Sequence, residues 1–203
     1  MNWDNVQTVH LDFLNELGNI GAGNAINSLA QMVSGRIGME VPKSGIVKIK
    51  DLFSMVGNEE ELVCCVAFVI SGDAPCNMFF ILRHQSALHL IDRIMGSIPG
   101  AGQVLDDLGQ SILNEVGNIL AGAFTNAITY MTGLKMRLSV PAFANDMLGA
   151  VISAALLEQG YFAEEVLVIE TRFYDQDIIL DGFLFLLPLG NSLEIIFKSV
   201  GIE

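Results

Sequence analysis

The sequence contains few cationic side chains. Lys and Arg together number 10, against 23 Asp and Glu, so the net charge is −13. Binding to nucleic-acid phosphates requires a surplus of Lys and Arg, and an anionic membrane surface repels a protein of this charge. The composition therefore argues against nucleic acid and membrane partners. A cationic group on a protein partner would instead be attracted.

Long apolar runs are also absent. The longest ones, residues 62–70 and 183–189, have the length of strands and fall below the ~18–20 residues of a membrane span. Residues 1–4 contain no basic segment leading into an apolar one, so we expect no signal peptide. These features predict a protein without membrane insertion, located in the cytoplasm.

Cysteine is scarce, and the sequence lacks the common motifs of metal and nucleotide sites. Cys64, Cys65 and Cys76 lie in apolar segments without a CxxC pair, which predicts buried thiols in a reducing compartment. His84 and His89 are five residues apart and would face different sides of a helix, so we expect no metal site. There is no GxSxG motif and no P-loop.

The chain contains an internal repeat with an offset of 99 residues. Of the 27 positions in 16–42, 10 are identical to those in 115–141 without a gap. Such self-similarity predicts two copies of one supersecondary unit, related by a pseudo-two-fold axis.

Each copy has the same predicted order of elements. A long helix comes first, about 6–34 and about 104–132, because apolar residues recur there at helical spacing. Gly35 and Gly133 stand where glycine commonly ends a helix. Short helices, about 85–95 and 191–200, close the two copies. The predicted strands cover residues 46–50, 61–71 and 76–82 in the first copy, and 150–157, 166–174 and 179–187 in the second.

The predicted fold class is α+β. We expect a duplicated unit with pseudo-two-fold symmetry, in which two long helices pack on a shared, largely antiparallel β-sheet. Residues 97–102 are the best candidate for the linker between the copies, because they are rich in Gly and Pro.

Each long helix carries a polar stripe. Asp12, Glu16 and Asn19 are spaced i, i+4 and i+7, and the second copy repeats this spacing. The residues of the second stripe are Ser111, Glu115 and Asn118. The small pairs Ala22-Gly23 and Ala121-Gly122 follow, and we expect them to continue the same face with almost no side chain. A carboxylate and an amide recur at fixed spacing while neighbouring apolar residues differ, which favours a functional stripe over a solvated or packing face.

Both copies resemble the motif Asp/Ser-x3-Glu-x2-Asn-x22-Pro of the CheC, CheX and FliY chemotaxis phosphatases. The first match ends at Pro42 and the second at Pro141, with no departure from the spacing. Two motif copies without an additional domain look like the CheC type. The resemblance implies one CheC-like phosphatase domain over residues 1–203, with repeats of about 5–97 and 104–203.

The resemblance further implies a function, hydrolysis of the phospho-aspartate of the response regulator CheY, and a second partner, the deamidase CheD. The catalytic residues carried over are Glu16, Asn19, Glu115 and Asn118. Supporting motif positions are Asp12, Ser111, Pro42 and Pro141. We expect no cofactor in the chain itself, with Mg²⁺ on the partner regulator. Asp146, in a segment that follows the second motif, is a candidate contact for CheD or a plain strand entry.

Two other functions fit the same residues. A non-catalytic binding or adaptor module for phosphorylated CheY or CheD would need the Glu residues but would tolerate Asn→Ala. A structural adaptor would use the stripe as a helix-packing seam, and it would need the Gly and Ala residues rather than Glu and Asn.

Overall fold

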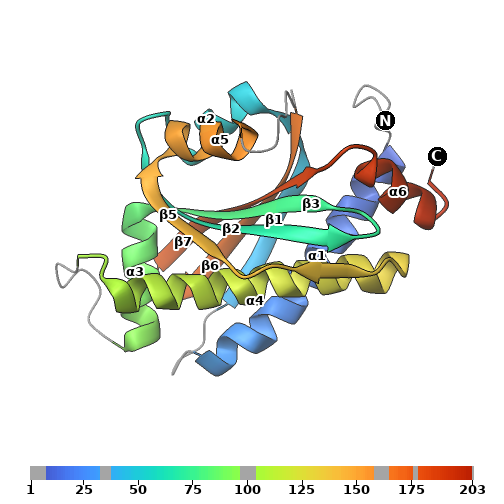
Figure 1. The fold of residues 1–203 in the computed structure, drawn as a ribbon. Coiled ribbons are helices and arrows are strands. Elements are labelled where there is room, and N and C mark those ends of the chain that lie inside the picture. The colour runs from blue at the N-terminus through green and yellow to red at the C-terminus, as the bar shows by residue number, and fades with distance from the viewer. Residues whose placement is uncertain (1–7, 33–37, 97–103, 158–164, 176–177, 203) are drawn as a thin grey trace.

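The computed structural model describes residues 8–32, 38–96, 104–157, 165–175 and 178–202 (Figure 1). The first half contains α1 (Thr8–Met32), β1 (Gly38–Lys48), α2 (Ile49–Val56), β2 (Leu62–Gly72), β3 (Cys76–Arg83) and α3 (His84–Met95). The second half contains α4 (Asp107–Thr132), β4 (Met136–Leu138), β5 (Ala142–Met147), α5 (Leu148–Leu157), β6 (Glu165–Asp175), β7 (Ile178–Pro188) and α6 (Ser192–Ser199).

All strands join one sheet of order β1-β6-β7-β3-β2-β4, and β5 also pairs with β2. Every pairing is antiparallel. β1 of the first half pairs with the β6–β7 hairpin of the second half, and β5 of the second half pairs with the β2–β3 hairpin of the first. The two halves are therefore equivalent: β1, β2 and β3 correspond to β5, β6 and β7, and swapping each strand for its equivalent reverses the strand order. The predicted α+β class and pseudo-two-fold arrangement are therefore confirmed, and the axis passes between β3 and β7.

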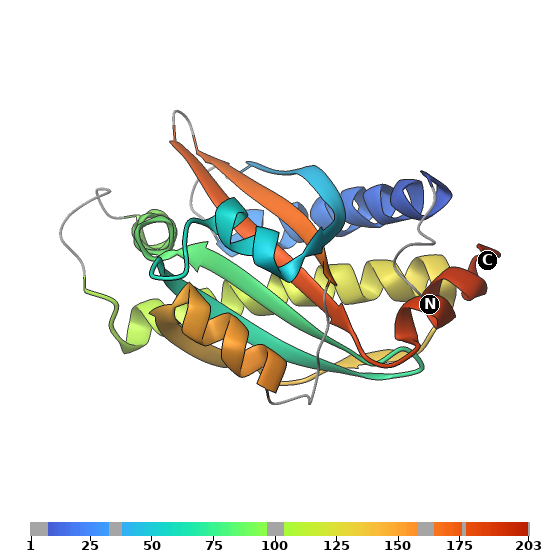
Figure 2. The same cartoon turned by 90° about the horizontal axis from the view of Figure 1, so that it is seen from above.

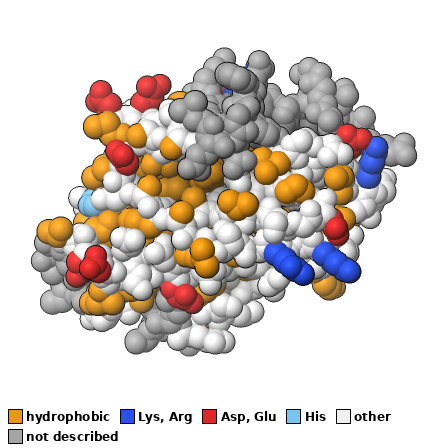
Figure 3. Space-filling model, in the orientation of Figure 1, with side chains coloured by type: hydrophobic (Ala, Val, Ile, Leu, Met, Phe, Trp, Pro, Cys, Tyr) orange, Lys and Arg blue, Asp and Glu red, His pale blue; other side chains and the backbone are white. Residues whose placement is uncertain are grey.

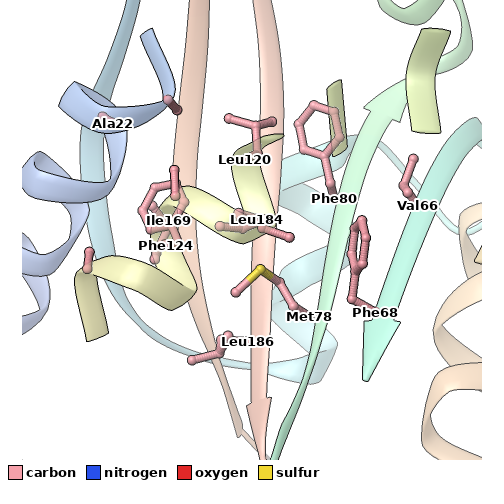
Figure 4. Packing of buried hydrophobic residues seen from close by; sticks show 14 of the residues in the cluster. Ala22, Val66, Phe68, Met78, Phe80, Leu120, Phe124, Ile169, Leu184 and Leu186 are labelled. Atoms are coloured by element: carbon pink, nitrogen blue, oxygen red, sulfur yellow. The ribbon is translucent and has the colours of Figure 1, made fainter. Parts of the chain in front are cut away.

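The sheet separates two layers of helices (Figure 2). Side chains of a strand alternate between the faces. On β2, Val66 and Phe68 belong to the core beneath α1 and α4, whereas Val63 and Cys65 belong to the core beneath α2 and α5. Figure 4 shows Phe124 of α4 within the first of these cores, among side chains of the sheet. Among the described residues, no helix is both long and apolar enough to cross a membrane.

Two glycines permit close packing of the long helices. A Cβ atom at Gly21 of α1 would lie 2.5 Å from Cδ1 of Phe124 on α4. A Cβ atom at Gly117 of α4 would lie 2.8 Å from Cγ1 of Val66 on β2. Both distances are too short for a real side chain, which explains why the helices tolerate residues of poor helix propensity there.

Most predicted elements are confirmed, but one strand is wrong. Residues 150–157 lie within helix α5, because burial of Leu148, Val151 and Ile152 follows a helical period, which a short apolar run does not distinguish from a strand. The strand predicted at 46–50 is the end of a longer β1, and its last two residues begin α2. The sequence did not predict α2, β4 or β5. The predicted linker 97–102 and Gly35 lie outside the described residues, whereas Gly133 ends α4 with a φ of 73° as predicted.

Candidate functional site

The stripe on α4 faces solvent. Asp106 fixes the start of the helix, because its side chain accepts a hydrogen bond of 2.8 Å from the backbone N–H of Gly109. The opposite side of the helix, including Leu113, Val116 and Leu120, is buried against the sheet. The predicted residues Ser111, Glu115 and Asn118 are therefore left exposed along one line of the helix surface.

The stripe on α1 has the same arrangement. Leu14 and Leu17 are each 2% exposed and hold the inner face of the helix. Asp12, Glu16 and Asn19 lie on the exposed side. The structure thus brings the predicted residues together in two separate sets, one on each long helix.

A groove of about 520 Å³ lies beside the α4 stripe. The helix forms one wall and the segment that joins β4 to β5 forms the other. The groove brings Pro141 next to the Glu and Asn of its own motif copy, despite the long sequence spacer between them. The lining residues are Ser111, Asn114, Glu115, Asn118, Leu138, Ser139, Val140 and Pro141.

The second wall forms because the edge strand is interrupted. The hydroxyl of Ser139 accepts a hydrogen bond from the backbone N–H of Val69 at 3.0 Å, and the N–H of Ser139 donates to the Val69 carbonyl at 2.9 Å. Val140 and Pro141 then leave the ladder before β5 begins. In the first half, the register of β1 shifts between Glu40 and Lys43, around Pro42. Proline has no N–H for the ladder, so both prolines fit an irregular edge strand.

Asn114 also belongs to the site, although the motif does not include it. This residue lines the groove, and its Oδ1 atom is buried without a hydrogen-bond partner in the described part of the chain. The residue 99 positions earlier, Asn15, is also an asparagine. The identity between the two copies therefore extends one residue toward the N-terminus of the Glu16–Glu115 pair, and this identity is the signal in the sequence for Asn15 and Asn114.

The expectation for the small residues is only half right. Ala22 and Ala121 are 5% and 0% exposed and belong to the core, so they do not continue the stripe. Gly23 and Gly122 do continue it. Seven residues separate each glycine from the Glu of its stripe, which is close to two full turns.

Asp146 lies near the end of β5, where its Oδ1 accepts a hydrogen bond of 2.7 Å from the backbone N–H of Met147. It is exposed and is not among the residues that line the groove. This segment has a counterpart in the first half, because β5 and α5 correspond to β1 and α2.

A Cys–His–Asn contact near β5 is not a nucleophilic site. Nδ1 of His84 lies 3.0 Å from Oδ1 of Asn145 and 3.9 Å from Sγ of Cys64. A catalytic histidine would need separate nitrogens for the nucleophile and the orienting residue, whereas here one nitrogen meets both. Burial also raises the pKa of Cys64 to about 12, which keeps the thiol protonated. Within the described residues, no three His, Cys, Asp or Glu side chains form a group that could hold a metal ion.

The exposed face over α4 and β5 has an uneven charge (Figure 3). Acidic side chains lie near the N-terminal end of α4, and basic side chains lie toward its C-terminal half. Apolar side chains lie between them over the strands.

The pseudo-symmetric fold defines a structural class, and solved structures of other proteins share it. FliY of Thermotoga maritima has the same fold, with a TM-score of 0.77 and 16% identity over 97% of this chain and 98% of that one. CheX in the CheX–CheY–BeF3–Mg²⁺ complex from Borrelia burgdorferi matches with a TM-score of 0.52 and 18% identity, over 83% and 95%.

Sequence comparison defines the family within this class. A profile of the CheC-like family matches residues 9–46 and 108–144, which enclose both motif copies. The CheY-P phosphatase CheC of Bacillus subtilis (strain 168) is 33% identical over 98% of this chain and 97% of that protein. The chain belongs to the CheC-like family.

Proposed function

We propose that the protein hydrolyses the phospho-aspartate of a CheY-type response regulator at two equivalent sites, one on α1 and one on α4. The observation that carries this proposal is the exposed Glu–Asn pair that recurs on both helices at the same spacing. The name of the 33% identical relative, a CheY-P phosphatase, supports the same substrate.

The chemistry requires little of the protein. An aspartyl phosphate is already activated, so hydrolysis needs an in-line water and stabilisation of charge at the transferring phosphoryl group. We propose that Asn19 and Asn118 each hold that water, because one amide offers both a donor and an acceptor. The role parallels that of the glutamine that positions water in small GTPases. A positioned amide needs no proton transfer of its own.

The remaining motif residues then serve docking. Glu16 and Glu115, one turn before each Asn, would pair with a cationic lysine beside the regulator's phospho-aspartate and fix the register of the complex. Asp12 and Ser111, a further turn away, orient or dock the partner. Pro42 and Pro141 shape the edge strands beside the helices. Mg²⁺ belongs to the regulator in this scheme, so the chain needs no cofactor of its own.

The other proposed partner is CheD, with Asp146 as the candidate contact. Its exposed position at the β5–α5 junction leaves it accessible without the use of either stripe.

The buried thiols of Cys64, Cys65 and Cys76 fit a reducing compartment, and we place the protein in the cytoplasm for that reason. The excess of negative charge makes nucleic acid an unsuitable partner.

The decay of a phosphorylated CheY-type regulator tests the proposal. Wild type should accelerate the decay, Asn19→Ala and Asn118→Ala should each retain part of the acceleration, and the double variant should lose about 100-fold, the cost of a misplaced reacting group. Asn24→Ala is the matched control, because Asn24 is exposed on the same helix about 140° around from Asn19.

The same experiment separates the alternatives. A double variant as active as wild type would overturn the water-positioning mechanism. A wild type that binds the regulator but leaves the decay unchanged, even with CheD added, would favour the binding module. A helix-packing seam would leave both helices unprotected in hydrogen–deuterium exchange with the phosphorylated regulator, whereas docking would protect them.

A further inference from the structure

Gly23 and Gly122 occupy equivalent places on the two stripes. Each lies four residues after the Asn of its motif, so it faces the same side of the helix one turn further along. Four residues beyond each glycine is another asparagine, Asn27 or Asn126, and both asparagines are exposed. In both halves, therefore, a residue without a side chain separates two exposed amides on one helix face.

The chain itself does not require glycine at these two positions. Among the residues that the structure describes, a Cβ atom at Gly23 or at Gly122 would meet no atom of another part of the chain within 4 Å, and neither residue has a positive φ. Gly21 and Gly117 differ, because a Cβ atom there would collide with Phe124 or Val66. Glycine in a helix interior destabilises it relative to alanine. The glycines of the stripe therefore lower stability without any gain in internal packing.

A close approach of the partner accounts for them. An Asn side chain is short, so water held by Asn19 or Asn118 lies within a few ångströms of the helix surface. The phosphoryl group must reach that water, so the partner's chain beside the phospho-aspartate has to come close to the helix turns next to each Asn. A Cβ atom there would add ~1.5 Å of height, the length of one carbon–carbon bond. A misplacement of about 1 Å is enough to cost 100-fold in rate.

We propose that Gly23 and Gly122 are positioning residues that leave clearance for the main chain of the phosphorylated regulator next to its phospho-aspartate. This inference rests on the proposed function and specifies which part of the partner contacts the helix. The groove beside α4 includes Asn118, the motif residue one turn before Gly122, so a partner that enters the groove lies next to the turn that carries the glycine. In this arrangement, the amides of Asn27 and Asn126 lie on the far side of the contact, within reach of the partner's backbone.

The test compares stability with activity in Gly23→Ala/Gly122→Ala. Because the space around both sites is empty, each alanine should raise the Tm by about 2–4 °C. The same variant should raise KM for the phosphorylated regulator about 5-fold or more, as overpacking of a close contact does. Binding of a CheY-type regulator activated with beryllium trifluoride and Mg²⁺ should weaken by a similar factor. Gln at both positions should weaken binding further without lowering the Tm.

Ser28→Ala is the matched control. Ser28 is exposed on α1 about 120° around the helix from Glu16, so alanine there improves helix propensity without filling the gap. It should raise the Tm and leave KM unchanged. A purely structural role for the glycines would move stability and activity together, whereas the proposed clearance moves them in opposite directions.

The outcomes distinguish this inference from the proposed function. If wild type accelerates the decay and the double Gly→Ala variant matches it in KM and binding, the clearance role is wrong and the phosphatase function stands. If wild type binds the activated regulator without accelerating its decay, the phosphatase function is wrong and the binding measurement alone decides on the glycines. If wild type does neither, both are wrong.

Discussion

Where the two long helices pack together, the halves of the molecule differ in the size of their side chains. α1 presents Gly21 and Ala25, whereas α4 presents Leu120 and Phe124 at the positions 99 residues later. Phe124 is 1% exposed, and its ring fills the space that a Cβ atom at Gly21 would need. A small residue on one helix has thus been matched by a large one on the other, and the packed interior has diverged between the copies while staying complementary.

The exposed stripes behave in the opposite way. Glu16 and Asn19 recur unchanged as Glu115 and Asn118, although all four residues are exposed on their helices. Interior positions that must only fill space are free to exchange volume, whereas surface positions without a structural constraint are usually free to change altogether. The same Glu and Asn occur in both halves, which therefore indicates a requirement from outside the chain, such as contact with a binding partner.

The largest predicted effect concerns a chemical difference between the halves. All three cysteines belong to the first half, and burial raises the pKa of Cys64, Cys65 and Cys76 from 9.0 to about 12. Unfolded thiols ionise near pH 9, so the unfolded state releases protons first. Stability is therefore full below pH 9 and falls as the pH rises toward 12.

At pH 10, this loss should be about 1–2 kcal/mol for each thiol and several kcal/mol for the three together. Urea unfolding at pH 8 and pH 10 measures it. Cys76→Val should reduce the difference by about one third, because one thiol no longer titrates. An unchanged pH dependence in that variant would mean that other groups in the chain cause the loss.

A smaller effect is expected from removing the difference in packing. Gly21→Ala should lower the free energy of unfolding by about 1–3 kcal/mol, because the new methyl group collides with the buried ring of Phe124. Gly21→Ala/Phe124→Leu should recover part of that loss in thermal or urea unfolding. If the single variant is as stable as wild type, the helices separate more easily at this contact than the geometry implies.

The sequence predicted the elements with strong periodicity and missed those without it. The long helices and both hairpins have clear apolar patterns, whereas β5 exposes nearly all its side chains and offers no alternation to detect. Pairing of β1 with β6, and of β5 with β2, joins residues that are 75 or more positions apart, and no local pattern encodes it. The duplicated sequence indicated that the fold is pseudo-symmetric. It did not indicate that the first strand of each half pairs with a strand of the other half.

For the candidate site, duplication was the informative signal. The duplication identified the Glu–Asn stripes and the prolines. Identical residues at the same spacing in both copies are improbable at surface positions that are free to change. Ser139 of the groove wall had no such signal, because the residue at its position in the first half is Glu40. Val140 does match Val41, but an apolar identity beside a proline does not indicate a groove wall. Ala22 and Ala121 precede their glycines directly in sequence but lie on the buried face, because consecutive residues of a helix are about 100° apart around its axis.

The smallest predicted effect concerns the one motif position at which the two sites differ in charge. Asp12 adds a carboxylate one turn before Glu16, whereas Ser111 leaves Glu115 as the only charge of its stripe. In an Asn19→Ala background, only the α4 site should remain active. Ser111→Asp should then raise kcat/KM for the phosphorylated regulator about 2–5-fold. Exposed charges at an interface contribute this much mainly through the association rate. Gln110→Asp adds the same charge about 140° around the helix from Glu115 and is the matched control.

Salt provides the decisive comparison for this variant. The Debye length is about 3 Å at 1 M salt, so the gain from Ser111→Asp should disappear there if it arises from attraction to a cationic group of the regulator. Asp12→Ser in an Asn118→Ala background should lower kcat/KM by a similar factor at low salt, making the α1 site resemble the α4 site. A gain that persists at 1 M salt would instead mean that the aspartate acts through a short-range contact, such as a hydrogen bond to the partner, and the two sites would then differ in geometry rather than in charge.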